Sequence, residues 1–399
     1  MNRPNWIPLF LMNFLTVLND NLLKWLVCFI SIKWVTTVSE SVIIAIASAM
    51  LVLPFILLSP LAGLLSVKYE KKNIMLIGKI AELPIMMIAV FGFVFQSIYL
   101  VMAGVLLLGV QSSLFSPSKY GLIRDVGGEE GIPFGTGTME MLTFIGVLLG
   151  TFLASEISDH YHISLIIILL IGVGLLGLLS TILIKAEEPQ PNKNYNESVN
   201  PVKFMIHSFK MAQQVKGLNY VILGLSFFWL VGALLQMNIK VYCDGLLKLT
   251  NVETGIVMVV AALGIGIGCF VTGLLSKNKV KIQFVPIGAV GMIIFFAMTY
   301  FMNPGAILLG IFIFFTAFFS GMFKVPLNAW IQSHVKGRML GDILAYENIC
   351  EFGFILFSSV IFYLVESRMV FIVLLALTLF IGIVLFFKIP GLKEKCISK

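Results

Sequence analysis

The sequence predicts an all-α membrane protein with about twelve transmembrane helices in two six-helix halves. Three observations lead to this prediction: an apolar composition, a series of apolar runs long enough to cross a bilayer, and short motifs that recur in the second half at a nearly constant spacing. Together they indicate a chain that is embedded in lipid and whose two halves have the same arrangement of helices.

The composition excludes a soluble globular protein. Of the residues, 59% are hydrophobic and 12% are charged, and the mean hydropathy is +1.02. Soluble domains are typically about 25% charged. A transmembrane β-barrel is excluded as well, because its strands alternate apolar and polar residues, whereas runs such as 163–184 are continuously apolar.

Apolar runs of about 20 residues, the length that crosses a hydrocarbon core, recur along the whole chain. The first run starts near Trp6 and contains Asp20 and Lys24, so we expect a retained span and not a cleaved signal peptide. The predicted spans are 6–32, 41–66, 74–96, 98–118, 134–157, 163–184, 217–240, 254–275, 282–302, 305–329, 340–365 and 368–388.

The basic residues predict the orientation of these spans. If the N-terminus lies inside, 19 of the 27 Lys and Arg residues fall on the inside, and only Lys33, Lys248 and Arg368 fall outside. Inside loops of bacterial membrane proteins carry such an excess. We therefore expect an inner-membrane protein with both termini in the cytoplasm, and the net charge of +7 needs no nucleic-acid partner.

The chain divides into four predicted parts. An N-terminal six-helix bundle occupies 1–184 and a C-terminal bundle occupies 217–389. Between them, 185–216 is polar and rich in proline and amide residues, which is typical of a linker; positions 204–215 within it predict a short amphipathic helix on the inner surface. The cytoplasmic tail is 390–399.

Short motifs recur between the two halves. Gly63-Leu-Leu-Ser66 ends the second predicted span, and Gly273-Leu-Leu-Ser276 ends the eighth, 210 residues later. An acidic residue six positions before a glycine recurs at an offset of 207, as Glu140 and Glu347. Transporters built from two such halves carry their substrate between the halves, near the bilayer midplane.

Five longer motifs resemble a known family. The stretch Gly63–Lys72 is similar to the loop 2–3 signature of the major facilitator superfamily, although Val67 stands where that signature has Asp and Glu70 where it has Gly. The other four resemble the bacterial lysophospholipid transporters: Leu18-Asn-Asp-Asn-Leu-Leu-Lys24, 113–123, 228–236 and 325–332.

The resemblance implies a major facilitator fold and the movement of lysophosphatidylethanolamine-like lipids from the outer to the inner leaflet for re-acylation. We expect any acyltransferase to be a separate protein. Some relatives carry an arginine in span 7 where this chain has Gln236. A facilitator that moves another small amphiphile or metabolite, such as a drug exporter, therefore stays open as an alternative.

Charged residues within spans are expensive in lipid and usually face a polar interior. Asp20 and Lys24 lie four residues apart, hence on one helix face. We expect Asp20 to meet the ammonium of a zwitterionic head group and Lys24 the phosphate; alternatively, they form a self-neutralising pair. Lys119 either contacts the phosphate at the inward mouth or extends to the interface.

Three glutamates suggest a gate. Glu140 lies in span 5, and Glu347 and Glu351 lie four apart in span 11. We expect them to pair with Lys119 and Lys324 on neighbouring helices, either as a gate at the inner face or as static contacts between helices.

The sequence also assigns roles to the remaining polar residues and to glycines within the spans. Gln236, near the outer end of span 7, and Lys324 complete the predicted substrate site with Asp20, Lys24 and Lys119. Lys79 and Glu82, at the start of span 3, are expected at the interface. Gly146-x-x-x-Gly150 and Gly264-x-Gly-x-Gly268 predict closely packed helix faces.

No feature of the sequence suggests an enzyme. The five cysteines are scattered without a C-x-x-C pair, the four histidines lie in predicted loops, and neither a nucleophile motif nor a P-loop occurs. We expect no cofactor, no metal site and no catalytic residue, and a chain that works as a monomer with the bilayer and its lipid substrate as partners.

The charge distribution yields a test of topology. In a cysteine-free background, Asn200→Cys should resist an impermeant maleimide added to the periplasmic side of intact cells and react in inside-out vesicles. Lys248→Cys, in a predicted outside loop, is the matched control and should react in intact cells. Strong labelling of residue 200 in intact cells would refute the inside location of the linker.

Overall fold

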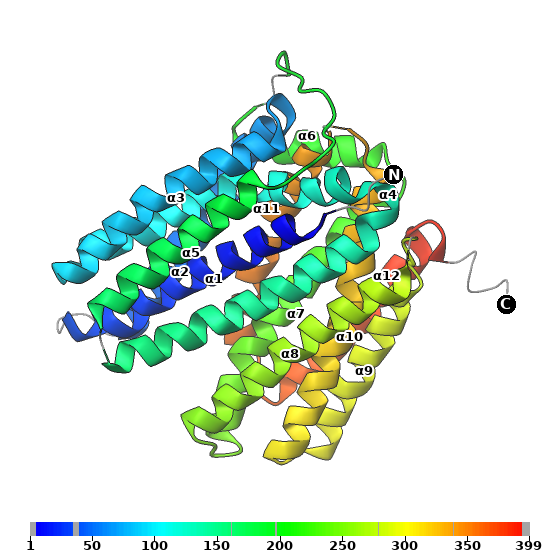
Figure 1. Cartoon of the computed structure of the whole chain (residues 1–399). Helices are drawn as coiled ribbons and strands as arrows, with labels where there is room; N and C mark the ends of the chain where they lie inside the picture. The colour runs from blue at the N-terminus through cyan, green and yellow to red at the C-terminus, as the bar shows by residue number, and fades with distance from the viewer. Residues whose placement is uncertain are drawn as a thin grey trace. The chain divides into compact units, whose positions relative to one another are not determined.

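The computed structural model describes residues 5–34, 40–160, 162–195, 198–277, 279–337 and 339–392. These residues form α-helices and one short 3-10 helix, η1 (Figure 1). The helices are α1 (Ile7–Ile30), η1 (Ser31–Trp34), α2 (Glu40–Lys68), α3 (Lys71–Val94), α4 (Ile98–His160), α5 (Ile163–Ile182), α6 (Pro201–Gln213), α7 (Leu218–Gly245), α8 (Asn251–Ser276), α9 (Phe284–Met302), α10 (Ala306–His334), α11 (Met339–Leu364) and α12 (Met369–Lys388).

All twelve predicted spans are helical in the structure. Ten helices of the described chain are long and apolar enough to cross a membrane, and one of them, α4, is long enough to cross it twice. Helix α4 contains two predicted spans, since Gly128 interrupts it with φ 63° and ψ −173°, a conformation that glycine adopts without a steric penalty. Helix α1, 24 residues long, supplies the remaining span.

The segment between α5 and α7 contains the predicted surface helix. Helix α6 begins at Pro201, three residues before the predicted start, and ends at Gln213. It is too short to span a bilayer, which needs about 20 residues. Arg3, Arg338 and the tail residues 393–399 carried part of the predicted charge asymmetry and lie outside the described residues.

By the contacts between residues, the chain separates into two compact units. Unit 1 comprises Met1–Gly128, Ile145–His207 and Lys336–Asn348. Unit 2 comprises Glu129–Phe144, Ser208–Val335 and Ile349–Lys399. The units follow the two halves of the chain except for two segments: 129–144 of α4 belongs with the second half, and 336–348 at the start of α11 belongs with the first.

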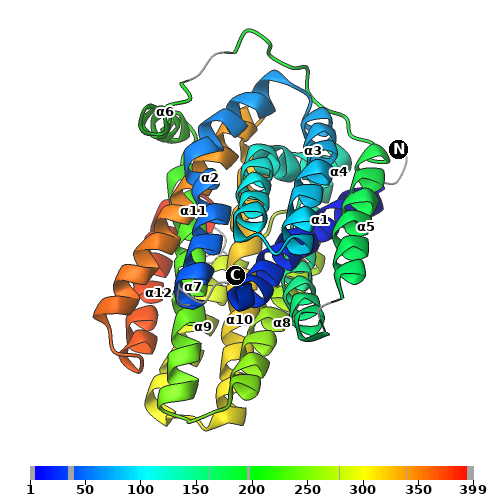
Figure 2. The same ribbon diagram turned by 90° about the vertical axis from the view of Figure 1, so that its left-hand side faces the viewer.

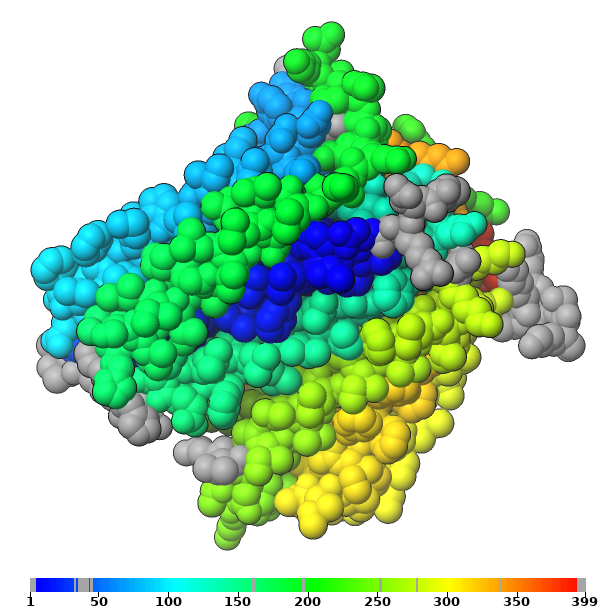
Figure 3. Space-filling view, in the orientation of Figure 1, coloured from blue at the N-terminus to red at the C-terminus, as the bar shows by residue number. Residues whose placement is uncertain are grey.

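Within unit 1, α5 packs against both α1 and α3 (Figures 1 and 2). The space-filling view shows α1 at the surface beside α5 (Figure 3). The predicted glycine face of α4 makes the close approach to α1: a Cβ added to Gly150 would lie 2.6 Å from the carbonyl oxygen of Leu18. Small residues at such crossings let two backbones approach, as membrane helices require.

Unit 2 has its closest packing between α8 and α10, with α9 against α10 and α12 against α9 and α7 (Figure 1). A Cβ at Gly264 of α8 would lie 2.5 Å from the carbonyl oxygen of Phe314, and one at Gly321 of α10 would lie 2.7 Å from the amide nitrogen of Cys269. The predicted small-residue face of α8 is therefore confirmed.

The expectation for Lys79 and Glu82 is wrong. Both side chains are fully buried in unit 1 and form an ion pair across one turn of α3. Asn19 of α1 donates a hydrogen bond to Glu82 Oε1 at 2.7 Å, and Gly177 of α5 leaves room for the lysine amine. The pair can be buried because each charge has an opposite charge beside it, and because the Asn19 amide of α1 supplies a hydrogen bond that water would supply at the interface.

This cluster predicts a large effect of breaking the pair. Lys79→Ala should destabilise the protein by about 3–5 kcal/mol, because it leaves the Glu82 carboxylate buried with one neutral donor. The double variant Lys79→Met/Glu82→Met should recover most of that loss. Unfolding titrations in SDS would measure both, with the exposed Lys203→Ala as control; a Lys79→Ala protein as stable as that control would contradict the prediction.

Candidate functional site

Asp20 lies on α1 in unit 1 and faces the first section of α4 (residues 98–127). The Ser112 hydroxyl donates a hydrogen bond to Asp20 Oδ2 at 3.0 Å. The other carboxylate oxygen, Oδ1, is buried and has no hydrogen-bond partner among the described residues. Such an oxygen carries a desolvation cost without compensation, and it can accept a hydrogen bond from a ligand.

Lys24 lies one turn beyond Asp20 on α1. Within the described part of the chain no ion pair joins the two side chains; the Lys24 amine lies 5.2 Å from the centroid of the Trp25 ring. The alternative of a self-neutralising pair is therefore wrong in this structure. The spacing of four residues places both groups on one face, but their charges do not neutralise one another through direct contact.

Lys119 lies two turns after Ser112 on α4, so the two residues share a face. Its side chain is buried, and its amine lies 5.0 Å from the centroid of the Tyr120 ring. On the same stretch of α4, Ser116 accepts a hydrogen bond from Asn348 of α11 at 3.2 Å. The structure thus arranges a buried carboxylate and a buried amine along α1 and α4 of unit 1.

Unit 2 contains a second polar arrangement, formed by residues 129–144 of α4 and by α10. The Lys324 amine donates to Glu140 Oε2 at 2.7 Å, which confirms the predicted pairing of these two residues. Asn328 donates to Glu140 Oε1 at 3.2 Å, and Gln332 donates to Asn328 at 3.1 Å. Residues 324, 328 and 332 recur every four positions and so form one polar row along α10.

Lys324 is fully enclosed in this structure. Beside Glu140, its amine lies 4.6 Å from the Trp229 ring centroid, 4.9 Å from that of Phe228 and 5.7 Å from that of Phe144. Aromatic faces attract cations when water is excluded. The lysine charge is thus compensated within unit 2.

The remaining predicted residues differ in burial. Gln236 is exposed on α7. Glu347 is buried in the segment of α11 that belongs to unit 1, while Glu351, one turn later, is half-buried in unit 2. Their predicted pairing with Lys119 and Lys324 stays a prediction.

Several polar partners were missed by the sequence analysis. Asn19, Ser112, Asn328 and Gln332 are neutral, and a neutral side chain in a span gives little warning of function. A signal was present for two of them, because Asn328 and Gln332 lie within the motif 325–332 and follow Lys324 at intervals of four residues.

Comparison with known proteins identifies the family. The model of the Major Facilitator Superfamily matches residues 9–357. The chain belongs to the major facilitator superfamily. Its members are transporters, so this chain is a multi-pass membrane transporter and not an enzyme, with the twelve-helix major facilitator fold.

The chain is also similar to bacterial proteins named as lysophospholipid transporters. The lysophospholipid transporter of Photorhabdus laumondii is 25% identical over 308 residues, which cover 75% of this chain and 74% of that protein. The lysophospholipid transporter of Cronobacter sakazakii is 26% identical over 309 residues, covering 74% and 73%. These matches bear out the family resemblance of the motifs.

Solved structures of transporters share the fold. A human organic anion transporter superposes with a TM-score of 0.77 at 14% identity, covering 96% of this chain and all of that one. A bacterial homologue of the iron transporter ferroportin, in its outward-facing state, gives a TM-score of 0.75 at 15% identity, covering 96% and 98%. At this identity they establish the fold alone.

The pair in unit 2 predicts a measurable coupling. In a double-mutant cycle with Glu140→Gln and Lys324→Met, each single variant should destabilise the protein more than the pair together, with a coupling energy of about 0.5–3 kcal/mol, as for contacting residues of one network. Unfolding titrations in SDS would measure it, and strictly additive effects would contradict a direct interaction.

Proposed function

We propose that this transporter moves a lysophospholipid, with a lysophosphatidylethanolamine-like head group, across the bacterial inner membrane. A lysophospholipid has one acyl chain, a phosphate and, in this class, an ammonium group. Two kinds of evidence support this substrate: the sequence similarity to lysophospholipid transporters over about three quarters of the chain, and polar groups within α1 that suit the head group.

The observation that carries the proposal is the unpartnered oxygen of Asp20. An ammonium group is the natural donor for it, since hydrogen bonds between two charged groups are about twice as strong as neutral ones. Lys24 lies four residues away, about 6 Å along the helix axis, and meets the phosphate of the same head group. Lys119 provides a second cation on α4, whereas Lys324 is already compensated by Glu140 and the surrounding aromatic rings.

In this proposal the transporter works by alternating access as a monomer. The N-terminal bundle (1–184) and the C-terminal bundle (217–389), joined by the linker 185–216, are its two moving parts. Ion pairs of Glu140, Glu347 and Glu351 break and re-form in each cycle. Lipid arrives from the outer leaflet and is released to the inner leaflet, where a separate acyltransferase consumes it; both termini lie in the cytoplasm.

One feature favours a second candidate function, the transport of another small amphiphile. Some lysophospholipid transporters carry an arginine in span 7, where this chain has the neutral and exposed Gln236. A substrate without a phosphate needs one cation fewer. Competition for uptake by zwitterionic, anionic and cationic single-chain lipids separates the two functions, because only the first requires the zwitterionic head group.

The assignment of Asp20 predicts the effect of its removal. Asp20→Ala should reduce uptake of labelled lysophosphatidylethanolamine into spheroplasts by about 10- to 100-fold, since a hydrogen bond to a charged group is worth about 1.5–3 kcal/mol. Asp20→Glu should retain part of the activity because its charge persists. The exposed Asp244→Ala is the matched control and should transport like the wild type.

Membrane level and melting temperature must be measured for each variant, because loss of a buried anion can also destabilise the bundle. A folded Asp20→Ala protein with wild-type uptake would move the head-group site elsewhere. A wild-type protein without any lysophospholipid uptake would instead refute the substrate.

A further inference from the structure

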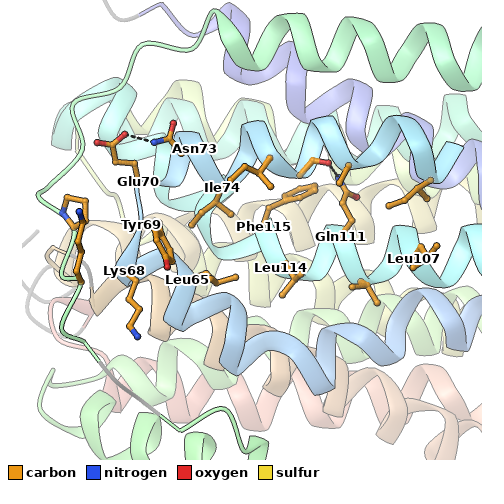
Figure 4. Close-up of a pocket in the computed structure, with 17 residues that line it drawn as sticks. Leu65, Lys68, Tyr69, Glu70, Asn73, Ile74, Leu107, Gln111, Leu114 and Phe115 are labelled. Carbon is orange, nitrogen blue, oxygen red and sulfur yellow. Dashed lines mark hydrogen bonds between the residues drawn. The ribbon is translucent and has the colours of Figure 1, made fainter. Parts of the chain in front are cut away.

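A large pocket lies within unit 1, away from Asp20. It is formed by α2, α3 and the first section of α4, and its volume is about 800 Å³ (Figure 4). Small-molecule sites commonly measure about 300–1,000 Å³. The proposed transport site does not use it, since neither Asp20, Lys24 nor Lys119 lines it.

The pocket has a polar end and an apolar end. Lys68, Tyr69, Glu70 and Asn73 gather at the turn between α2 and α3, while Leu107 marks the opposite end in Figure 4. Between them the wall is mainly aliphatic. Gln111 lies in this wall, but its amide is already engaged with the Gly78 carbonyl at 3.0 Å.

The length of the pocket matches one acyl chain. Along α3 it extends from Asn73 to Ile85, which is about 18 Å at 1.5 Å per residue. One leaflet of the hydrocarbon core is about 15 Å deep, half of the full thickness. Ile77 and Leu107 are exposed side chains of this pocket, so a chain can enter from the lipid side of the helices.

Two cations stand at the polar end without an anionic partner. Neither Lys68 nor Lys193 takes part in an ion pair or side-chain hydrogen bond within the described chain. Glu70, the nearby carboxylate, accepts a hydrogen bond from Asn73 at 2.9 Å. Two uncommitted amines above an apolar channel are complementary to a phosphate ester on an acyl chain.

The linker holds the second cation in place. The Asn192 amide donates to the Val67 carbonyl at the end of α2 at 3.2 Å, and Pro191 and Lys193 line the pocket on either side of that contact. Glu188 binds the first amides of α3, at Lys71 and Lys72, where helix amides lack intrahelical partners. The linker is thus fixed at the pocket mouth, on the side that the charge distribution assigns to the cytoplasm.

We propose that this pocket binds one lysophospholipid molecule at the inner leaflet, with its acyl chain between α2, α3 and α4 and its phosphate between Lys68 and Lys193. We choose a lysophospholipid over a two-chain phospholipid because the pocket, about 800 Å³ in volume, must hold the head group as well as the tail. The site is separate from Asp20, so its occupancy does not depend on transport by the proposed head-group site.

The test is photolabelling of the purified full chain in nanodiscs. The probe is lysophosphatidylethanolamine with a diazirine near the end of its tail, and the labelled peptides are identified by mass spectrometry. Label is expected on the apolar end of the pocket, around Ile85 and Leu107. Leu65→Trp, which fills the pocket from α2, should reduce this label at least fivefold, whereas the lipid-exposed Leu57→Trp on the same helix should leave it unchanged.

The head group is tested separately, with variants at exposed or half-exposed positions that do not threaten folding. Lys68→Gln and Lys193→Gln should each weaken binding of the probe about fivefold, since one basic residue near a lipid phosphate is worth about 1 kcal/mol. Lys185→Gln, an exposed linker residue outside the pocket, is the matched control and should bind as the wild type does.

Several results would overturn the proposal. Equal labelling by a two-chain phosphatidylethanolamine probe would show that a bilayer lipid occupies the pocket, and equal labelling by a monoacylglycerol probe would remove the role of the phosphate. Loss of the pocket label in Asp20→Ala would show that the two sites are not separate. If the label persists in Asp20→Ala while uptake is lost, both the pocket and the proposed transport site are supported.

Discussion

The structure depends on how ionisable side chains are compensated inside an apolar bundle. Lipid offers no hydrogen bonds, so a charge within a span must find its partner in the protein. Lys79 pairs with Glu82 and Lys324 with Glu140, and both pairs are almost completely buried. Each pair is completed by an amide, from Asn19 in one unit and Asn328 in the other. The first set of contacts fixes which faces of α1 and α3 meet, and the second fixes which faces of α4 and α10 meet.

The same principle separates structural charges from candidate substrate contacts. Lys324 is saturated by a carboxylate and three aromatic rings. Asp20 has one bonded oxygen and one buried oxygen without a partner, and Lys68 and Lys193 lack an anion within the described residues. A group that the protein leaves uncompensated is the one that a ligand can complete, which is why the two proposals rest on these residues.

The internal repeat has a counterpart in the division into units. Glu140 and Glu347 occupy equivalent positions in the two halves, and each lies in the short segment that belongs with the opposite half, 129–144 and 336–348. The chain therefore passes from one unit to the other inside α4 and α11, after each of these glutamates, and also at Gly128, within α6 and between α10 and α11. The covalent connections between the units thus include two helix interiors as well as the linker.

The sequence by itself determined the fold class, the twelve spans, the presence of a helix in the linker and the family, because apolar length and short motifs are local properties of the chain. It also named Lys324 as one of two expected partners for three glutamates, which the pair with Glu140 confirms, and it predicted the glycine faces of α4 and α8. It placed Lys79 and Glu82 wrongly, and it gave no sign of Ser112 beside Asp20 or of the pocket lined by Lys68 and Lys193. Those features are decided only by the tertiary structure. A charge in a helix can meet a partner charge, an aromatic ring or a pocket, depending on how the neighbouring helices are rotated. The periodicity of one helix does not specify that rotation.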